Sequence, residues 1–242
     1  MKMSKKDTSQ HIAQKDKVKD DFEIRKLKWT PKQEQIIQAA LDKTTNIVIL
    51  DGLPGTAKTL LSVYCSLELL KAKKISDIVY IRSLIQSTDG QTGFLTGDLD
   101  EKTFFYNVPL FDKLEELLNK SSIESLYKQE RIKTYPVSLL RGYTFNVNSV
   151  ILDEGQNMMF DSLVTAATRM GKFSKLFICG DSIMQNDLGK RSGFKEFCEI
   201  FQDQDSRDNG IQYFKLGPED IMRSGIVRFI VDKITKYKEI IH

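Results

Sequence analysis

The sequence predicts an α/β protein with a mainly parallel sheet that carries helices on both of its faces. Short, continuous apolar segments recur along the chain, at residues 46–51, 77–82, 148–153, 175–180 and 211–216. Helical patterns lie between several of these segments or after the last, at residues 58–71, 161–170, 193–201 and 218–238. Strands that are apolar on both faces and alternate with helices are typical of a parallel sheet that is covered on both sides.

Composition excludes several classes of protein. Of the 242 residues, 40% are hydrophobic and 29% are charged, which are ordinary values for a globular chain and exclude a fibrous or fully disordered one. No apolar run approaches the ~20 residues of a membrane-spanning helix, and the N-terminus has no apolar leader. We therefore expect a cytoplasmic protein without a membrane partner. Three cysteines without a C-x-x-C spacing fit a reducing compartment. The two histidines lie at residues 11 and 242, which argues against a histidine metal site or a Ser/His triad.

The chain divides into a basic arm, residues 1–28, and one domain, residues 29–242. The arm holds nine Lys/Arg and five Asp/Glu, a net charge of +4, so the domain carries −1 of the total of +3. Little apolar periodicity occurs in the arm, which we expect to be unstructured and either to attract polyanions or simply to be solvated. Within the domain, residues 83–110 read as a long connection and residues 112–135 as a small helical insertion.

The strongest motif is a phosphate-binding loop between the first strand and the first long helix. It comprises Gly52, Leu53, Pro54, Gly55, Thr56, Ala57, Lys58 and Thr59. Backbone N–H groups of such a loop surround phosphate oxygens at a helix N-terminus, Lys58 reaches the β- and γ-phosphates, and Thr59 binds Mg²⁺. ATP and Mg²⁺ are the expected ligands. Ala57 stands where glycine is usual, and we expect helical dihedral angles there, which alanine adopts easily.

Two further strand ends complete the expected site. The apolar segment Val150-Ile-Leu-Asp-Glu delivers Asp153 to the Mg²⁺ shell and Glu154 to orient or deprotonate the attacking water. The segment that ends at Gly180 and Asp181 is followed by Gln185, which can sense the γ-phosphate if this strand lies between the other two.

With these motifs in place, the chain resembles the PhoH-like family of P-loop ATPases, which is related to superfamily 1 helicases. The similarity covers roughly residues 30–240 and includes the phosphate loop, residues 93–102, Arg141-Gly-Tyr-Thr, residues 150–157, Thr168-Arg-Met-Gly, Gly180-Asp181 and Asp220-Ile-Met-Arg. The resemblance implies a RecA-like core, commonly assembled as a ring, with a link to RNA metabolism. No nuclease domain, present in some relatives, is expected here.

Gln33 and four arginines remain open. Gln33 either reads adenine, as a glutamine upstream of the loop does in helicases, or closes the helix start Thr30-Pro31-Lys32-Gln33 as the third residue of a capping box. Arg169 is the first choice for an arginine finger and Arg223 the second, although each arginine is also compatible with a packing role. Arg82 and Arg141 are candidates for contacts with nucleic-acid phosphates.

The leading functional hypothesis is an ATP hydrolase that acts on RNA or single-stranded nucleic acid in the manner of a helicase or translocase. Because the chain has one phosphate loop, a second core has to come from a neighbouring copy, most simply in a ring of six. The alternatives are a regulatory ATP-binding oligomer without motor activity and a small-molecule kinase. A recognisable acceptor pocket is absent, and the Asp-Glu pair favours water as the nucleophile.

Overall fold

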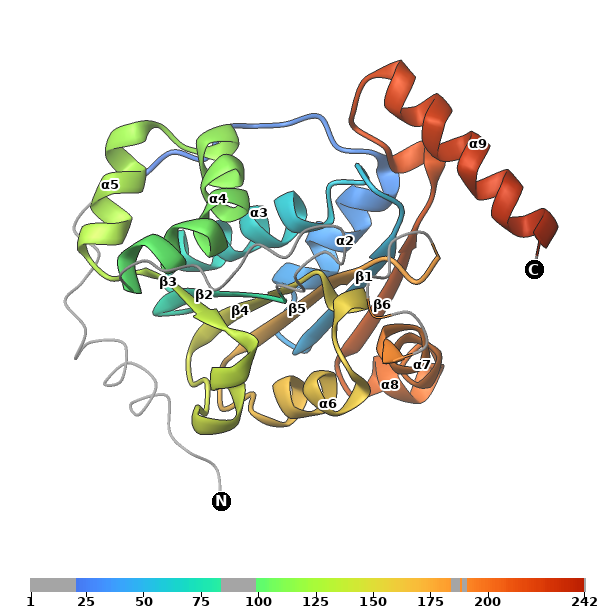
Figure 1. Cartoon of the computed structure of the whole chain (residues 1–242). Helices are drawn as coiled ribbons and strands as arrows, with labels where there is room; N and C mark the ends of the chain where they lie inside the picture. The colour runs from blue at the N-terminus through green and yellow to red at the C-terminus, as the bar shows by residue number, and fades with distance from the viewer. Residues whose placement is uncertain (1–20, 84–98, 184–187, 189–190, 242) are drawn as a thin grey trace.

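The computed structural model describes residues 21–83, 99–183, 188 and 191–241. Within them, six strands form one sheet in the order β3-β2-β4-β5-β1-β6 (Figure 1). The strands are β1 Ile47–Gly52, β2 Asp77–Arg82, β3 Ile132–Pro136, β4 Asn148–Asp153, β5 Lys175–Gly180 and β6 Ile211–Leu216. Every pairing is parallel, so all six carboxyl ends lie at one edge. The predicted fold class is confirmed.

Helices cover both faces of the sheet, as predicted. One face carries α2 Pro31–Leu41, α3 Lys58–Lys71, α4 Leu99–Leu117 and α5 Lys120–Lys128, and the other carries α6 Phe160–Thr168, α7 Phe194–Ile200 and α8 Gln204–Asp208 (Figure 1). Side chains of β1 alternate between the two cores: Val48 and Leu50 pack on the α3 side, and Ile49 packs on the α6 side. The inner strands β1, β2, β4 and β5 are buried on both faces, which explains why their sequences are continuous apolar runs.

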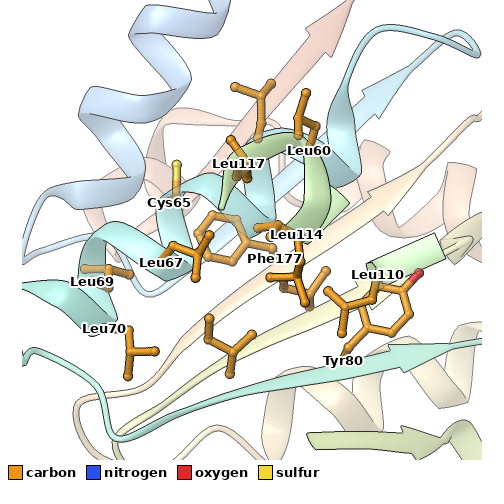
Figure 2. Packing of buried hydrophobic residues seen from close by; sticks show 14 of the residues in the cluster. Leu60, Cys65, Leu67, Leu69, Leu70, Tyr80, Leu110, Leu114, Leu117 and Phe177 are labelled. Carbon is orange, nitrogen blue, oxygen red and sulfur yellow. The ribbon is translucent and has the colours of Figure 1, made fainter. Parts of the chain in front are cut away.

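The core on the α3 side gives the phosphate loop a rigid base. In Figure 2, side chains of α3 and α4 meet over the sheet residues Tyr80 and Phe177; they are Leu60, Leu67 and Leu70 from α3, and Leu110, Leu114 and Leu117 from α4. The leucines of this set that α4 contributes are fully buried. Because α3 packs against both α4 and the sheet, its N-terminal turn is held at the carboxyl edge, where the loop ends.

The segment between β2 and β4 differs from the prediction. Helix α4 begins at Leu99, inside the stretch expected to be a connection, and residues 84–98 lie outside the described residues. The end of α4 and all of α5 confirm helices near residues 112–128. Residues 132–136, however, form the edge strand β3. Ile132 is its one buried residue, and the sequence Ile-Lys-Thr-Tyr-Pro contains no apolar run of the kind by which the other strands were predicted.

The C-terminal end of the expected arm packs on the domain. Phe22 is 4% exposed and belongs to the core beside α3 and α4. The backbone N–H of Arg25 donates to the carbonyl of Leu117 (2.8 Å), and its guanidinium donates to the carbonyl of Glu115 (2.5 Å). Ile24 and Leu27, both partly buried, pack against the same core. Ordered contacts therefore start before Trp29; residues 1–20 lie outside the described residues.

The last part of the chain crosses the carboxyl edge before it forms α9. The single helix predicted for residues 218–238 is instead a 3-10 turn, Pro218–Asp220, followed by an irregular segment and then α9, Gly225–Ile241. This segment brings Met222 and Arg223 over the phosphate loop. Among the described residues, no helix combines the length and the hydropathy that a membrane span requires.

Candidate active site

The phosphate loop lies between β1 and α3, at the carboxyl edge of the sheet. A Cβ atom on Gly52 would come within 2.6 Å of the Cβ of Leu216 in β6, so the position has no room for a side chain. Gly55 has φ +86°, in the left-handed region that favours glycine. Leu53 and Thr56 are buried behind the loop, and Pro54, Gly55, Ala57, Lys58 and Thr59 line the cavity in front of it.

The expectation of helical dihedral angles at Ala57 is wrong. Ala57 has φ 64° and ψ 23°, a left-handed conformation, and it is the N-cap residue of α3. For an L-residue with a Cβ atom this conformation costs roughly 1–2 kcal/mol. The glycine that is usual in phosphate loops would adopt it without that cost, so this chain carries local backbone strain at the loop.

Lys58 closes the loop on itself. Its ammonium donates hydrogen bonds to the carbonyl oxygens of Gly52 (2.6 Å) and Leu53 (3.0 Å). The hydroxyl of Thr56 also donates to the carbonyl of Leu53 (2.7 Å). The ammonium thus spans the concave side of the loop, where its charge faces the cavity.

Asp153 receives two hydroxyl groups from neighbouring elements. The Thr59 hydroxyl donates to Oδ1 (2.9 Å), and the hydroxyl of Tyr80, in β2, donates to Oδ2 (2.5 Å). Burial and the adjacent Asp153 carboxylate raise the pKa of Tyr80, so it remains a donor. The predicted pair Thr59 and Asp153 is therefore in direct contact. No role was predicted for Tyr80. The feature of the sequence that could have indicated one is its hydroxyl group, which stands among the aliphatic residues Ile78, Val79 and Ile81.

Glu154 is held by residues on both sides of its carboxylate. Its backbone is left-handed, with φ 58°, and turns the side chain out of the strand direction. The guanidinium of Arg82 donates to Oε1 (3.4 Å), and the amide of Gln156 donates to Oε2 (2.5 Å). Burial and the neighbouring Asp153 raise the pKa of Glu154, against the opposing effect of Arg82.

Gln156 links the acidic strand to the next strand end. Besides contacting Glu154, its amide oxygen accepts the backbone N–H of Asp181 (3.1 Å). Gln156 lies within residues 150–157, which resemble the family, but no role was predicted for it. The strand order places β5 between β1 and β4, which is the arrangement that the Gln185 prediction required. Gln185 itself lies outside the described residues.

The structure separates the two candidate finger arginines. Arg223 lines the same cavity as the loop, and a Cβ atom built on Gly55 would lie 3.3 Å from its Cδ. The preceding residue, Met222, donates its backbone N–H to the carbonyl of Gly55 (3.0 Å). Arg169 instead shares a different surface depression with Arg141 and Asp161. Arg82 faces Glu154 inside the site.

Gln33 closes the start of α2, as the capping box predicts. Its amide oxygen accepts the backbone N–H of Thr30 (3.0 Å), and its amide nitrogen donates to the carbonyls of Asp220 (3.0 Å) and Thr56 (3.4 Å). The side chain is fully buried and does not line the cavity. It ties the phosphate loop to the turn that precedes Arg223, and adenine reading would require these bonds to break.

The cavity in front of the loop has a volume of about 440 Å³. It is bounded by the loop, by the acidic pair Asp153 and Glu154, and by Arg223. Among the described residues, no group of three or more His, Cys, Asp or Glu side chains forms a metal cluster. The Thr59 hydroxyl and the Asp153 carboxylate, which contact each other, are the oxygen atoms that could bind a metal ion. This pair suits Mg²⁺, which is usually held by one or two carboxylates, water and substrate phosphates.

Comparisons with known proteins agree with the motifs. A family model described as "PhoH-like protein" matches residues 26–235. A PhoH-like protein of Mycobacterium tuberculosis is 33% identical over 202 residues, which cover 83% of this chain and 55% of that protein. A PhoH-like protein of Bacillus subtilis is 33% identical over 194 residues, 80% of this chain and 60% of the relative. Protein PhoH of Escherichia coli is 31% identical over 188 residues, 76% of this chain and 51% of the relative.

The chain thus spans about half to three fifths of the length of these curated relatives. Among solved structures, a DUF1998 helicase, MrfA, bound to DNA aligns with 90% of this chain and 32% of its own, at 10% identity and a TM-score of 0.39. The assignment rests on the sequence matches, because the family model covers most of the chain: this protein belongs to the PhoH-like family.

Proposed function

We propose that this protein hydrolyses ATP with Mg²⁺. The observation that carries the proposal is that Lys58 and Thr59, at the start of α3, and Asp153 and Glu154, at the end of β4, line one cavity. Thr59 and Asp153, which form a hydrogen bond, are 94 residues apart in the chain. A cation, two hard oxygen ligands and a further carboxylate are the groups that phosphoryl transfer to water requires.

Each residue then has a chemical role. Phosphate oxygens displace the carbonyls of Gly52 and Leu53 from the Lys58 ammonium, and the N-terminal turn of α3 adds backbone N–H donors. Thr59 and Asp153 hold Mg²⁺, which neutralises charge on the phosphates when it is bound. Glu154 orients a water molecule. The water oxygen bonds to the γ-phosphorus, the bond to the β–γ bridging oxygen breaks, and the water proton passes to the Glu154 carboxylate, leaving ADP and phosphate.

We further propose that the ATPase acts on RNA or single-stranded nucleic acid, in the cytoplasm, as a homo-oligomeric ring of six. The basic segment of residues 1–28 and the exposed Arg141 supply positive charge for phosphates. Because the cavity holds catalytic groups from one core only, a neighbouring copy is needed to complete the far side of the nucleotide. Arg169 remains the first choice for the residue that reaches the neighbouring copy's nucleotide. Arg223 lies beside its own loop, which favours a role within the same chain.

Two substitutions test the ATPase proposal. Lys58→Ala should lower turnover on the order of 10²-fold or more, because the γ-phosphate loses its cation. Glu154→Gln should still bind Mg-ATP but lower turnover by roughly 10²–10⁴-fold, because the water loses its base. Lys71→Ala, at the exposed end of α3, is the matched control and should leave both unchanged. Wild-type turnover in both site variants would refute the assignment.

Two measurements separate the alternative functions. Phosphate release without any acceptor argues against a small-molecule kinase, and stimulation by poly(U) or poly(dT) distinguishes a nucleic-acid motor from a regulatory ATP-binding oligomer.

The proposed ring is tested separately, first by light scattering, which gives the mass of the protein in solution. In a ring, mixing Arg169→Ala with Lys58→Ala should restore part of the activity, because the two defects lie on opposite sides of a shared site. Turnover by a monomer that does not depend on protein concentration would refute the ring.

A further inference from the structure

Arg82 occupies a position from which it can control Glu154. It is the last residue of β2, and it lies in register with Asp153 of β4, immediately before Glu154. Its Nη2 atom is 3.4 Å from Oε1 of Glu154, while Gln156 engages Oε2. Both oxygens of the carboxylate are therefore held. Two donors restrain the orientation of the carboxylate, so the observed contacts favour a resting arrangement of the site.

The guanidinium has unused capacity toward an anion. The side chains of Arg82 and Glu154 are 25% and 30% exposed, so the pair can be reached from solvent. Among the described residues, the buried Nε of Arg82 has no hydrogen-bond partner. A guanidinium offers five donors in a planar fork that matches the oxygens of a phosphate group. A phosphodiester next to Arg82 would engage donors that the Glu154 contact leaves open.

The exchange of one anion for another at Arg82 is energetically easy. A partly exposed ion pair contributes little free energy, so breaking the contact between Arg82 and Glu154 costs little. A phosphate is also an anion, and its contact with Arg82 replaces the one that was lost. Gln156 remains on the second oxygen of Glu154 and keeps the side chain near the cavity. Withdrawal of Arg82 would therefore free Oε1 for the water molecule without releasing the carboxylate from the site.

We propose that Arg82 couples nucleic-acid binding to ATP hydrolysis: without nucleic acid it restrains Glu154, and a backbone phosphate of a bound single strand draws it away. The inference rests on the proposed function and names the regulation of the same site. Arg82 acts here as a positioning residue, since it works through Glu154.

The test measures ATP turnover by wild type and Arg82→Ala, each without and with saturating poly(U). Arg82→Ala should raise the basal rate about fivefold, the rate equivalent of a partly exposed ion pair, and should lose most of the stimulation by poly(U). Arg82→Lys keeps the charge without the planar fork and should keep a low basal rate. Arg207→Ala, an exposed arginine on α8, is the control and should behave as wild type.

The outcomes separate this inference from the proposed function. Binding of a fluorescent ATP analogue and circular dichroism verify that each variant is folded. No ATP hydrolysis by folded wild-type protein, with or without poly(U), would refute the proposed function. If wild type does hydrolyse ATP, three results would refute the coupling role and leave the proposed function standing. They are no stimulation of wild type by poly(U), a basal rate of Arg82→Ala that is unchanged or lower, and full stimulation of Arg82→Ala by poly(U).

Discussion

Ala57→Gly should stabilise the protein, although glycine in place of alanine normally destabilises one. Ala57 has φ 64°, and the left-handed conformation costs an L-residue roughly 1–2 kcal/mol. Glycine removes that cost but adds about 0.4–1 kcal/mol of conformational entropy to the unfolded chain. The difference is a gain of about 0.5–1 kcal/mol in the free energy of unfolding. For a domain of this size it corresponds to a rise of about 2 °C in Tm.

A matched substitution makes the sign of this effect informative. Ala39 lies within α2, in right-handed helical conformation, so Ala39→Gly should lower the free energy of unfolding by roughly 0.5–1 kcal/mol. The same chemical change is thus expected to have opposite effects at the two positions. Ala57→Val adds a β-branched side chain at positive φ and should destabilise more than Ala39→Gly does.

Urea unfolding followed by circular dichroism measures all three variants against wild type. Binding of Mg-ATP is measured in parallel, because a loop without backbone strain has less to gain by rearranging around phosphate. If Ala57→Gly destabilises the protein as much as Ala39→Gly, then the strain assigned to the loop is absent and the reasoning fails.

Two further predictions concern packing and pH. Gly180→Ala should lower the free energy of unfolding by about 1–3 kcal/mol, because the added Cβ would lie 2.5 Å from the ring of the fully buried Phe194. Gly142→Ala is the control: a Cβ at residue 142 meets no atom within 4 Å, so this variant should be as stable as wild type in the same thermal unfolding experiment. Burial lowers the pKa of the Lys175 ammonium to about 8 from its ordinary value of 10.5. Between these values the unfolded chain binds a proton that the folded chain does not, so stability rises with pH. From roughly pH 7.5 to 10, wild type should gain about 2 kcal/mol relative to Lys175→Met, and an unchanged difference in urea unfolding would contradict the shifted pKa.

The sequence by itself determined the fold class and the residue motifs of the candidate site. Strands β2, β4, β5 and β6 have the bounds that their apolar runs predict, and β1 is displaced by one residue. Burial on both faces makes the inner strands β1, β2, β4 and β5 continuous in hydropathy, so local sequence is enough to find them. The phosphate loop and the Asp153–Glu154 pair are likewise local patterns, because each is a short run of neighbouring residues.

Local sequence patterns did not predict elements that have few apolar residues, or backbone conformations that the residue type does not favour. The edge strand β3 has no continuous apolar run, and the segment that contains Phe22 packs on the core although its sequence is mostly polar. Ala57 adopts a left-handed conformation that no property of alanine favours, because the strand before it and the helix after it dictate the turn.

Only the tertiary structure decided which distant residues meet. Arg82 faces Glu154 because β2 and β4 are neighbours in the sheet, and Arg223 lies over Gly55 because the segment after β6 returns across the carboxyl edge. For the same reason, the amide of Gln33 donates a hydrogen bond to the carbonyl of Asp220, in the turn before Arg223. Strand order and chain crossings set these contacts, and they depend on packing free energy summed over the whole domain, which no short stretch of sequence contains.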